Sequence, residues 1–215
     1  MKWKDLTLPW QAAFEEAWDA YMGGSIPIGA ALADETGAVI ARGRSRQWEH
    51  EAPQGHICWS KLSHAELNAL LQVSGHDHPN IRGCTLYTTV EPCPLCMGAL
   101  VMSNVRGLRY AARDGWAGSA AHSAAMPFIA SKNLQIEGPL PGLGAISAVL
   151  HTERALRLGF EAASRLIGTW RADYPEAVAL GHRWYEEGML TDAAEAGRST
   201  AWVFEAISAA LEGRQ

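Results

Sequence analysis

The sequence has few charged residues and no excess of basic ones. Charged side chains make up 19% of its 215 residues, and the formal net charge at pH 7 is −5. A disordered chain would be richer in charge and poorer in apolar residues, which make up 48% here. The composition also supplies no broad basic surface for long nucleic acids. We therefore expect a folded protein with one domain, or one domain and an appended piece.

Features of secreted and membrane proteins are also missing. Four cysteines are too few for the disulfide framework of an extracellular domain. No apolar segment follows residues 1–5 that could form a signal peptide, and no run of 18 apolar residues could form a membrane-spanning helix. We expect a soluble, cytoplasmic protein that does not contact membranes.

Hydrophobic periodicity and turn residues predict alternating helices and strands over the first 137 residues. Two short strands around a turn at 34–37 predict a hairpin. The small residues Gly29, Ala30 and Ala31 indicate that either a helix or a ligand approaches the first strand closely. Strands are expected at 27–33, 38–43, 84–90, 107–112 and 134–136, and helices at 7–23, 64–73, 94–103 and 122–132.

The pairing of the last two strands and the start of one helix can also be predicted for residues 1–137. The last two strands are separated by a helical crossover, so we expect them to pair in parallel. Ser63 followed by Glu66 has the spacing of a capping box, which predicts that Ser63 caps the helix that begins near His64.

The C-terminal third has a different composition. Residues 138–142, Gly-Pro-Leu-Pro-Gly, have the composition of a linker. Beyond them, three helices are expected at 145–167, 175–187 and 192–211, with breaks near Gly168 and Gly188. We therefore expect a first domain at 1–137 and a helical extension at 138–215, packed on that domain or at a dimer interface.

A long loop is expected at residues 44–62. Loops of this length are uncommon within compact domains and often serve function. It ends next to His64 and contains Trp48 and Trp59, which could form pocket walls or a lid. The alternative is an ordinary surface loop that the two tryptophans anchor.

Four residues near the starts of two predicted helices have the chemistry of a catalytic zinc site. His64, Cys93 and Cys96 supply three zinc ligands, and a catalytic site leaves the fourth position open for water. A helix N-terminus favours the deprotonated form of a cysteine. Glu66 follows His64 by two residues and could transfer protons without binding the metal. This set is complete for hydrolytic deamination.

Other readings of these cysteines remain open from the residues alone. A Cys-x-x-Cys pair can be a redox dithiol, which would need neither His64 nor Glu66. A structural zinc site would need a fourth protein ligand, which His56 or Cys58 could supply.

The two motifs together resemble the signature of the cytidine deaminase-like superfamily. They are His64-Ala65-Glu66 and Pro92-Cys93-Pro94-Leu95-Cys96. The resemblance is greatest to the branch that contains tRNA adenosine deaminases, cytosine deaminases, guanine deaminases and small bacterial nucleoside deaminases. It covers roughly residues 10 to 137, and its other matching pieces are Ile26-Pro27-Ile28-Gly29-Ala30, Thr89-Val90-Glu91 and Ala112-Arg113-Asp114.

The resemblance implies a three-layer α/β/α fold with a five-stranded mixed sheet whose last two strands are parallel, followed here by the helical extension. It implies that residues 1–137 form a zinc deaminase catalytic domain. In that domain His64, Cys93 and Cys96 would bind Zn²⁺, and Glu66 would be the proton shuttle. Members of this branch are commonly homodimers, so a homodimer is expected.

The resemblance also indicates where substrate would bind. The backbone amide of Ala65 would face the substrate. At the position where several relatives place an asparagine that contacts the base or ribose, this sequence has Ser45. The full set of residues expected to contact substrate is Ala65, Ser45, Pro27, Glu91, Trp48 and Trp59. Specificity is expected to depend on Ser45, on the loop up to Lys61 and on the helices beyond Gly142.

Three functions fit these patterns. The first is zinc-dependent hydrolytic deamination of a small amino-heterocycle with release of ammonia; the substrate would be a nucleobase, a nucleoside or an analogue such as an aminotriazine. The second is an enzyme on nucleic acid, such as a tRNA adenosine deaminase, which would need a basic surface near the site. The third is a non-catalytic zinc-binding protein, in which Glu66 would have no purpose. The acidic net charge and the Trp-bearing loop favour the first function.

Overall fold

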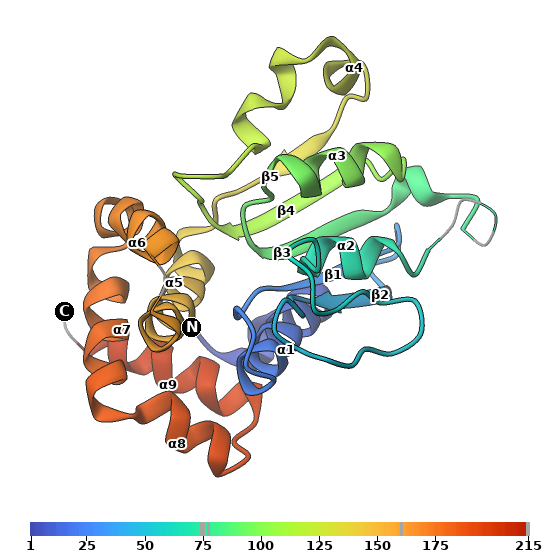
Figure 1. Ribbon diagram of the computed structural model, residues 1–215. Coiled ribbons are helices and arrows are strands. Elements are labelled where there is room, and N and C mark those ends of the chain that lie inside the picture. The colour runs from blue at the N-terminus through green and yellow to red at the C-terminus, as the bar shows by residue number, and fades with distance from the viewer. Residues whose placement is uncertain (74–75, 77, 160, 214–215) are drawn as a thin grey trace.

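The computed structural model describes residues 1–73, 76, 78–159 and 161–213 (Figure 1). In chain order its elements are η1 (Trp3–Asp5), α1 (Leu8–Met22), β1 (Gly29–Ala33), β2 (Val39–Arg44), α2 (Ala65–Leu70), η2 (Ile81–Gly83), β3 (Thr85–Val90), α3 (Pro94–Met102), β4 (Gly107–Ala112), η3 (Ala120–Ala125), α4 (Pro127–Ala130), β5 (Gln135–Glu137), α5 (Pro141–Leu158), α6 (Glu161–Asp173), α7 (Pro175–Glu187), α8 (Met189–Glu195) and α9 (Thr200–Glu212).

The five strands form one mixed sheet in the order β2-β1-β3-β4-β5. Strand β1 is antiparallel to both of its neighbours, and the β1–β2 hairpin confirms the expected one. Strand β4 is parallel to both β3 and β5, which confirms the prediction for the last two strands. The crossover from β3 to β4 is helix α3, as parallel pairing requires.

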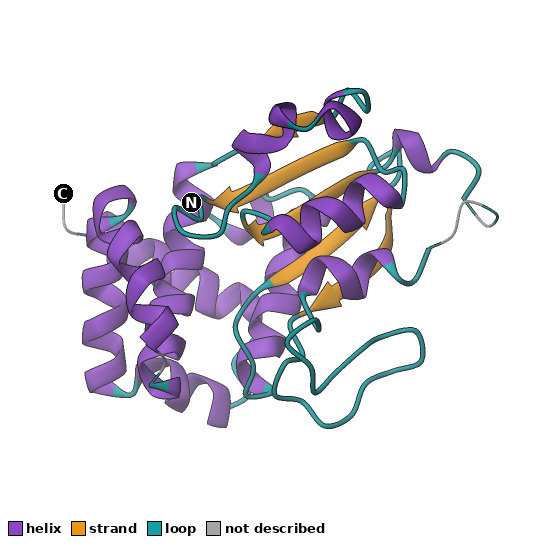
Figure 2. Ribbon diagram, turned by 45° about the horizontal axis from the view of Figure 1, so that its top comes forward, coloured by secondary structure: helices purple, strands orange, loops and turns teal. Residues whose placement is uncertain are grey.

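Side chains alternate between two hydrophobic cores on opposite faces of the sheet. Ala31 and Ala33 of β1 belong to the core that contains α1 and the C-terminal helices. Ala30 and Leu32 of the same strand belong to the core that contains α2 and α3. Successive residues of a strand point to opposite faces, so β1 supplies both cores. The resulting helix–sheet–helix arrangement confirms the three-layer fold; Figure 2 shows α2 and α3 side by side over one face of the strands.

Two glycines allow the flanking helices to approach the sheet closely. A Cβ atom at Gly29 would lie 2.1 Å from the carbonyl oxygen of Ala13 in α1, so the close neighbour of the first strand is a helix. A Cβ atom at Gly43 of β2 would lie 2.3 Å from the backbone of Ala65 in α2. The second glycine therefore fixes the position of the helix that carries Glu66.

The C-terminal helices pack directly on the sheet. Helix α5 contacts β3 and β4, and α5 to α9 share one hydrophobic core with α1 (Figure 1). The fully buried rings of Trp18, Trp170 and Phe204 lie in this core. Along the described residues, no helix is both long and apolar enough to cross a membrane. The division into domains at residue 137 stays a prediction.

The prediction of three C-terminal helices is wrong, because the described residues beyond 140 form five, α5 to α9. The first expected helix is divided at Gly159, which has φ +64°, a value that glycine adopts without strain. The predicted break at Gly168 does not occur, because this residue lies within α6. The predicted break at Gly188 is confirmed, with φ +74°. A further turn, which contains Gly197, separates α8 from α9.

Three other local predictions need correction. The expected linker is shorter than predicted, because Pro141 and Gly142 already belong to α5. The helix expected at 122–132 is replaced by η3 and the single turn α4. The capping box is also wrong: His64 is the N-cap of α2, and no side chain caps this helix start. Glu66 lies inside the protein instead, where its oxygens bond to other residues.

Candidate active site

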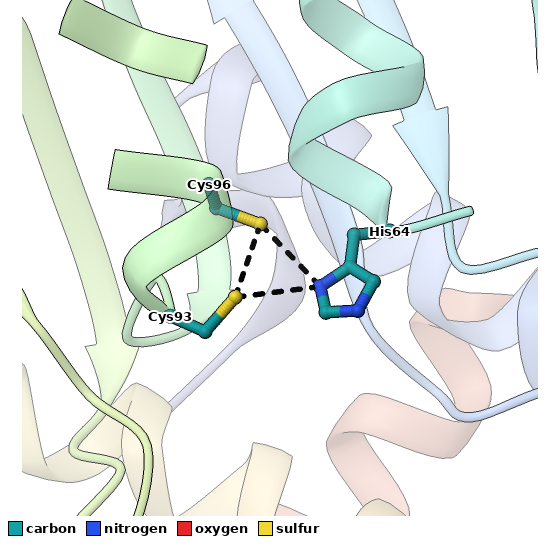
Figure 3. Close-up of side chains that lie close together, drawn as sticks. All are labelled: His64, Cys93 and Cys96. Carbon is teal, nitrogen blue, oxygen red and sulfur yellow. Dashed lines mark hydrogen bonds between the residues drawn. The ribbon is translucent and has the colours of Figure 1, made fainter. Parts of the chain in front are cut away.

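The N-terminal ends of α2 and α3 bring the predicted ligands together. His64 is the N-cap residue of α2 and Cys93 is the N-cap residue of α3. Pro94 occupies the first turn of α3, where its missing N–H costs no hydrogen bond. Cys96 lies one turn further along the same helix. All three side chains converge on one point between the two helices (Figure 3).

The distances within this group fit a zinc ion. Nδ1 of His64 lies 3.7 Å from Sγ of Cys93 and 3.4 Å from Sγ of Cys96, and the two sulfurs are 3.7 Å apart. A tetrahedral ion with ordinary Zn–S and Zn–N bonds would separate two sulfurs by about 3.8 Å, and a sulfur from a nitrogen by about 3.6 Å. The triangle therefore already has the size that Zn²⁺ requires, with one position left for another ligand.

The protonation states of the three residues are coupled. The hydrogen bond between the two sulfurs is the largest effect that lowers the pKa of Cys93, to about 4. The same bond, together with burial, raises the pKa of Cys96. The hydrogen bond to Cys93 raises the pKa of His64 against the opposing effect of burial. The lowered pKa favours the thiolate form of Cys93, which is the form that binds zinc.

Glu66 lies beside the triangle without belonging to it. Its Oε2 accepts a hydrogen bond from the Cys96 thiol at 3.3 Å, and its Oε1 accepts one from the Thr88 hydroxyl at 3.2 Å. The side chain is only 4% exposed, and burial raises the pKa of this carboxyl group. A buried carboxyl group with a raised pKa next to a metal site is suited to accept and return a proton.

Other candidate ligands lie outside the cluster. Over the part of the chain that the structure describes, the group able to hold a metal consists of His64, Cys93 and Cys96. His56 and Cys58, the alternative fourth ligands of a structural zinc site, are not in it. Three protein ligands with an open fourth position are typical of catalytic zinc.

A cavity of about 690 Å³ opens in front of His64. Three tryptophans, Trp48, Trp59 and Trp116, lie in its wall. The loop between β2 and α2 brings two of them there. This loop is anchored by Asn68, whose side chain bonds to the backbone of Ile57 and Arg44. The wall also contains Ile26, Pro27, Gln47, Ser60, Lys61, Asp114, Ala117, His151, Arg154, Ala155, Leu158 and Leu166.

The structure places the expected substrate-contact residues in two groups. Pro27, Trp48 and Trp59 lie in the cavity wall with His64. Ala65 is the first residue of α2, so its amide has no acceptor within the helix; the residue is buried and lies outside the described wall, and its contact with substrate stays a prediction. Ser45 lies outside the described wall; it is buried, and its hydroxyl is 3.4 Å from that of Ser25.

Glu91 also lies behind the cavity wall, where it holds a loop. Its two carboxylate oxygens accept hydrogen bonds from the backbone amides of Asp114 and Ala120, each at 3.1 Å. The segment fixed in this way contains Trp116 and Ala117 of the wall. In this structure, Glu91 shapes the cavity through that segment. A direct contact of Ser45 or Glu91 with substrate stays a prediction.

None of the site residues predicted from the sequence lies in the helical extension. The structure adds His151 and Arg154 of α5 to the cavity wall, together with Leu166 of α6. The helices beyond Gly142 are expected from the sequence to affect specificity, which is a general signal. No pattern in the sequence indicates the individual residues, because their place depends on how α5 packs against the sheet.

Comparisons with known proteins agree with this geometry. Residues 4–112 match the family model described as the cytidine and deoxycytidylate deaminase zinc-binding region. The chain is 32% identical to the cytosine deaminase of Candida albicans over 92 residues, which are 43% of this chain and 56% of that protein. It is 35% identical to the tRNA-specific adenosine deaminase of Bacillus subtilis over 104 residues, which are 47% of this chain and 58% of that protein.

Two further matches show how far the similarity extends. A tRNA(Ile)-lysidine synthase of Deinococcus radiodurans is 34% identical over 95 residues, 44% of this chain but only 15% of that protein. The match thus spans 56% and 58% of the length of the two deaminases and 15% of the length of the synthase. A solved mutant structure in complex with 8-azaguanine has the same fold, with a TM-score of 0.51 and 24% identity over 69% of this chain and 85% of the other.

The matched region contains both motifs and ends with strand β4. It therefore includes the whole triangle of His64, Cys93 and Cys96, and Glu66 beside it. Because the match covers half of the chain and the residues it contains form the expected cluster, the chain belongs to the family of the cytidine and deoxycytidylate deaminase zinc-binding region.

Proposed function

We propose that this protein is a zinc-dependent hydrolytic deaminase that acts on a small amino-heterocycle. It would replace an exocyclic amine of a nucleobase, nucleoside or close analogue by oxygen and release ammonia. The observation that carries this proposal is the position of Glu66, buried against Cys96 but outside the ligand triangle. A purely structural zinc site would not need a buried carboxylate there, since burial of an unneeded charge is unfavourable.

Zinc held by His64, Cys93 and Cys96 would supply an electrophile that lowers the pKa of a water molecule at its open position to roughly 7. Glu66 would take a proton from this water and deliver it to a ring nitrogen as the new C–O bond forms. It would then carry the second proton to the exocyclic amine, so that the C–N bond breaks and ammonia leaves. The two protons of water thus end on the ring and on the leaving group.

The cavity supports a flat aromatic substrate. Trp48, Trp59 and Trp116 provide apolar surface suited to stacking on a heterocycle. Its volume, about 690 Å³, is in the range of ordinary small-molecule sites. Ala65, at the start of α2, would offer its backbone amide to a ring atom near the reacting carbon. Specificity for one ring would come from the polar residues around this cavity.

A nucleic-acid substrate is the second candidate, favoured by the similarity to the tRNA-specific adenosine deaminase of Bacillus subtilis. Trp59 and Trp116 are each 59% exposed and could stack on neighbouring bases. The net charge of −5 works against this candidate, because phosphate contacts require basic side chains. The expected homodimer and cytoplasmic location stay predictions.

Ammonia release from a panel of compounds tests the proposal. The panel contains free bases, nucleosides, nucleotides and a tRNA anticodon stem–loop, each incubated with the zinc-loaded protein and with protein treated with a chelator. We expect zinc-dependent ammonia release from at least one small heterocycle. Release from the stem–loop alone would favour the second candidate. No release from any compound would contradict the proposed function.

A further inference from the structure

Helix α5 forms one wall of the proposed active-site cavity. His151, Arg154, Ala155 and Leu158 of this helix line the cavity, as do Trp48 and Trp59 of the loop between β2 and α2. Positions 151 and 154 are three residues apart, so they lie on the same face of the helix. The family match ends at residue 112, and this wall therefore comes from a part of the chain that the match does not cover.

Arg154 brings a positive charge into this wall. Its Nε donates to the carbonyl oxygen of Ser25 at 3.2 Å, and its Nη2 donates to that of Gly24. Its guanidinium group also lies over the ring of Tyr21, 5.4 Å from the ring centre. None of these partners is anionic, and no carboxylate among the described side chains lies within ion-pair distance of it. The charge is therefore held in place but not neutralised by an ion pair.

Three other arginines, Arg44, Arg46 and Arg157, differ in this respect. Arg44 and Arg46 both bind the carboxylate of Glu49. Arg157, one turn after Arg154 on α5, binds the buried carboxylate of Glu153. Burial is the largest effect on Arg154 and lowers its pKa, and the opposing effects of Tyr21 and of the Glu153 carboxylate do not offset it.

His151 provides a second polar group on the same face. It is 6% exposed, and its Nδ1 is buried without a hydrogen-bond partner. Trp170 packs against the imidazole edge to face, with ring centres 4.9 Å apart, and its indole N–H is fixed by the carbonyl oxygen of Arg113. Burial lowers the pKa of His151 to about 4, so the ring is neutral and keeps one N–H donor. A buried polar group without a partner is unfavourable, and a ligand can satisfy it.

The remaining charges of the wall leave an excess of positive charge. Lys61 lies at the edge of the cavity as a second cation. The one carboxylate of the described wall belongs to Asp114, whose Oδ1 accepts hydrogen bonds from the backbone amides of Trp116 and Ala117. The wall formed by α5 is therefore suited to a negatively charged group of the ligand.

We propose that Arg154 and His151 determine substrate specificity by binding an oxyanion substituent of the amino-heterocycle, a carboxylate or a phosphate group. This inference rests on the proposed deaminase function and names the substrate class more closely. The guanidinium group would form a charge-assisted hydrogen bond to the oxyanion, and the neutral imidazole would donate its N–H to the same group. Both residues would bind the substituent, and Glu66 would transfer protons at the reacting carbon.

Matched pairs of neutral and anionic compounds test this inference in the zinc-loaded protein. The pairs are cytosine with 5-carboxycytosine, cytidine with cytidine monophosphate, and guanosine with guanosine monophosphate. Binding is followed by tryptophan fluorescence, since three tryptophans line the cavity, and turnover by ammonia release. We expect the anionic member of at least one pair to bind roughly ten- to a hundredfold more tightly, the range of a charge-assisted hydrogen bond. The carboxylate and phosphate pairs identify which oxyanion is preferred.

Substitutions then test whether Arg154 and His151 cause the preference for anionic compounds. Arg154→Gln should raise the KM of the anionic compound roughly tenfold or more relative to the KM of its neutral partner. Arg154→Lys should restore part of this loss, and His151→Gln should weaken binding of the anion less strongly. Arg157→Gln is the matched control, because Arg157 lies on the same helix outside the described wall and should not change the preference. Thermal unfolding shows whether each variant is folded.

The outcomes separate the two proposals. If the neutral compounds bind as tightly and react as fast as their anionic partners, the proposed role of Arg154 and His151 is wrong. The proposed deaminase function would still stand. Anionic compounds that bind tightly without any ammonia release would overturn the deaminase function. If neither member of any pair binds, or if Arg154→Gln weakens neutral and anionic compounds equally, the anion site is wrong.

Discussion

The carboxylate of Glu66 accepts a hydrogen bond from the thiol of Cys96 at 3.3 Å, although 30 residues separate them in the sequence. This contact places the proposed proton shuttle next to a zinc ligand and keeps it out of the ligand triangle. It depends on the packing of α2 beside α3, and Gly43 lets α2 lie close to strand β2 by having no side chain. Each prediction below tests one part of this arrangement or of the scaffold that maintains it.

Glu66→Gln should keep zinc and lose activity. The amide has nearly the same shape as the carboxylate but cannot accept and return a proton, so we expect deamination to fall by roughly 10²- to 10⁴-fold. Metal content by elemental analysis and ammonia release measure the two effects. Glu15→Gln, an exposed substitution on α1, is the control. Activity that survives in the Glu66 variant would exclude this residue as the shuttle.

Cys93→Ala should lose zinc, because two remaining ligands do not hold the ion tightly. Cys58→Ala should retain it, since Cys58 lies outside the ligand cluster. Elemental analysis after dialysis gives zinc per chain for both variants and for the wild type. Full retention of zinc in Cys93→Ala would remove Cys93 from the ligand set.

Gly29→Ala should destabilise the protein strongly. The added Cβ would lie 2.1 Å from the carbonyl oxygen of Ala13 and 2.4 Å from the amide of Ala17, so helix α1 must move away from the sheet. We expect a loss of about 1–3 kcal/mol in the free energy of unfolding. Gly168→Ala is the control: nothing lies within 4 Å of its Cβ position in α6, and alanine favours a helix. Urea denaturation measures both, and equal effects would contradict the close contact.

Glu91→Gln should loosen the segment that contains Trp116. Both carboxylate oxygens accept from backbone amides, and the amide NH₂ group would face one N–H without an acceptor. We expect a cost of about 1–3 kcal/mol and faster hydrogen exchange at residues 114–120. Glu137→Gln at the surface should change neither measurement. Unchanged exchange in the Glu91 variant would show that other contacts hold the segment.

The stability of the protein should fall in acid because of His151. Burial lowers its pKa from 6.5 to about 4 in the folded protein, so between these values the unfolded chain binds a proton that the folded protein does not. The free energy of unfolding therefore decreases as the pH falls from 6.5 to 4, by at most about 3 kcal/mol, and this contribution levels off below pH 4.

The comparison with His151→Gln isolates this contribution. Glutamine does not titrate, so the loss of stability between pH 7 and pH 4 should be smaller in the variant by about that amount. Urea denaturation of both proteins in the presence of a chelator removes any effect of metal release. An identical pH dependence in the two proteins would show that His151 is not held in the neutral form.

Much of the fold could be predicted because it depends on short-range patterns. The two faces of β1 and the turn at 34–37 determine the hairpin, and the crossover between β4 and β5 determines the parallel pairing of these last two strands. The residues at which helices end were harder to predict from the sequence. A glycine such as Gly159 ends a helix when it adopts a positive φ, whereas Gly168 stays helical, and the residue type is the same in both cases.

The sequence by itself determined the chemistry of the site. His64, Glu66, Cys93 and Cys96 carry their function in their donor atoms and spacing, and both motifs begin helices that local signals already predict. Only the tertiary structure decided what surrounds them. Arg154 reaches the cavity because α5 packs on β3 and β4, and Glu91 binds a distant loop because β3 ends beside it. Such contacts depend on the packing of whole helices and strands, which no local pattern of residues specifies.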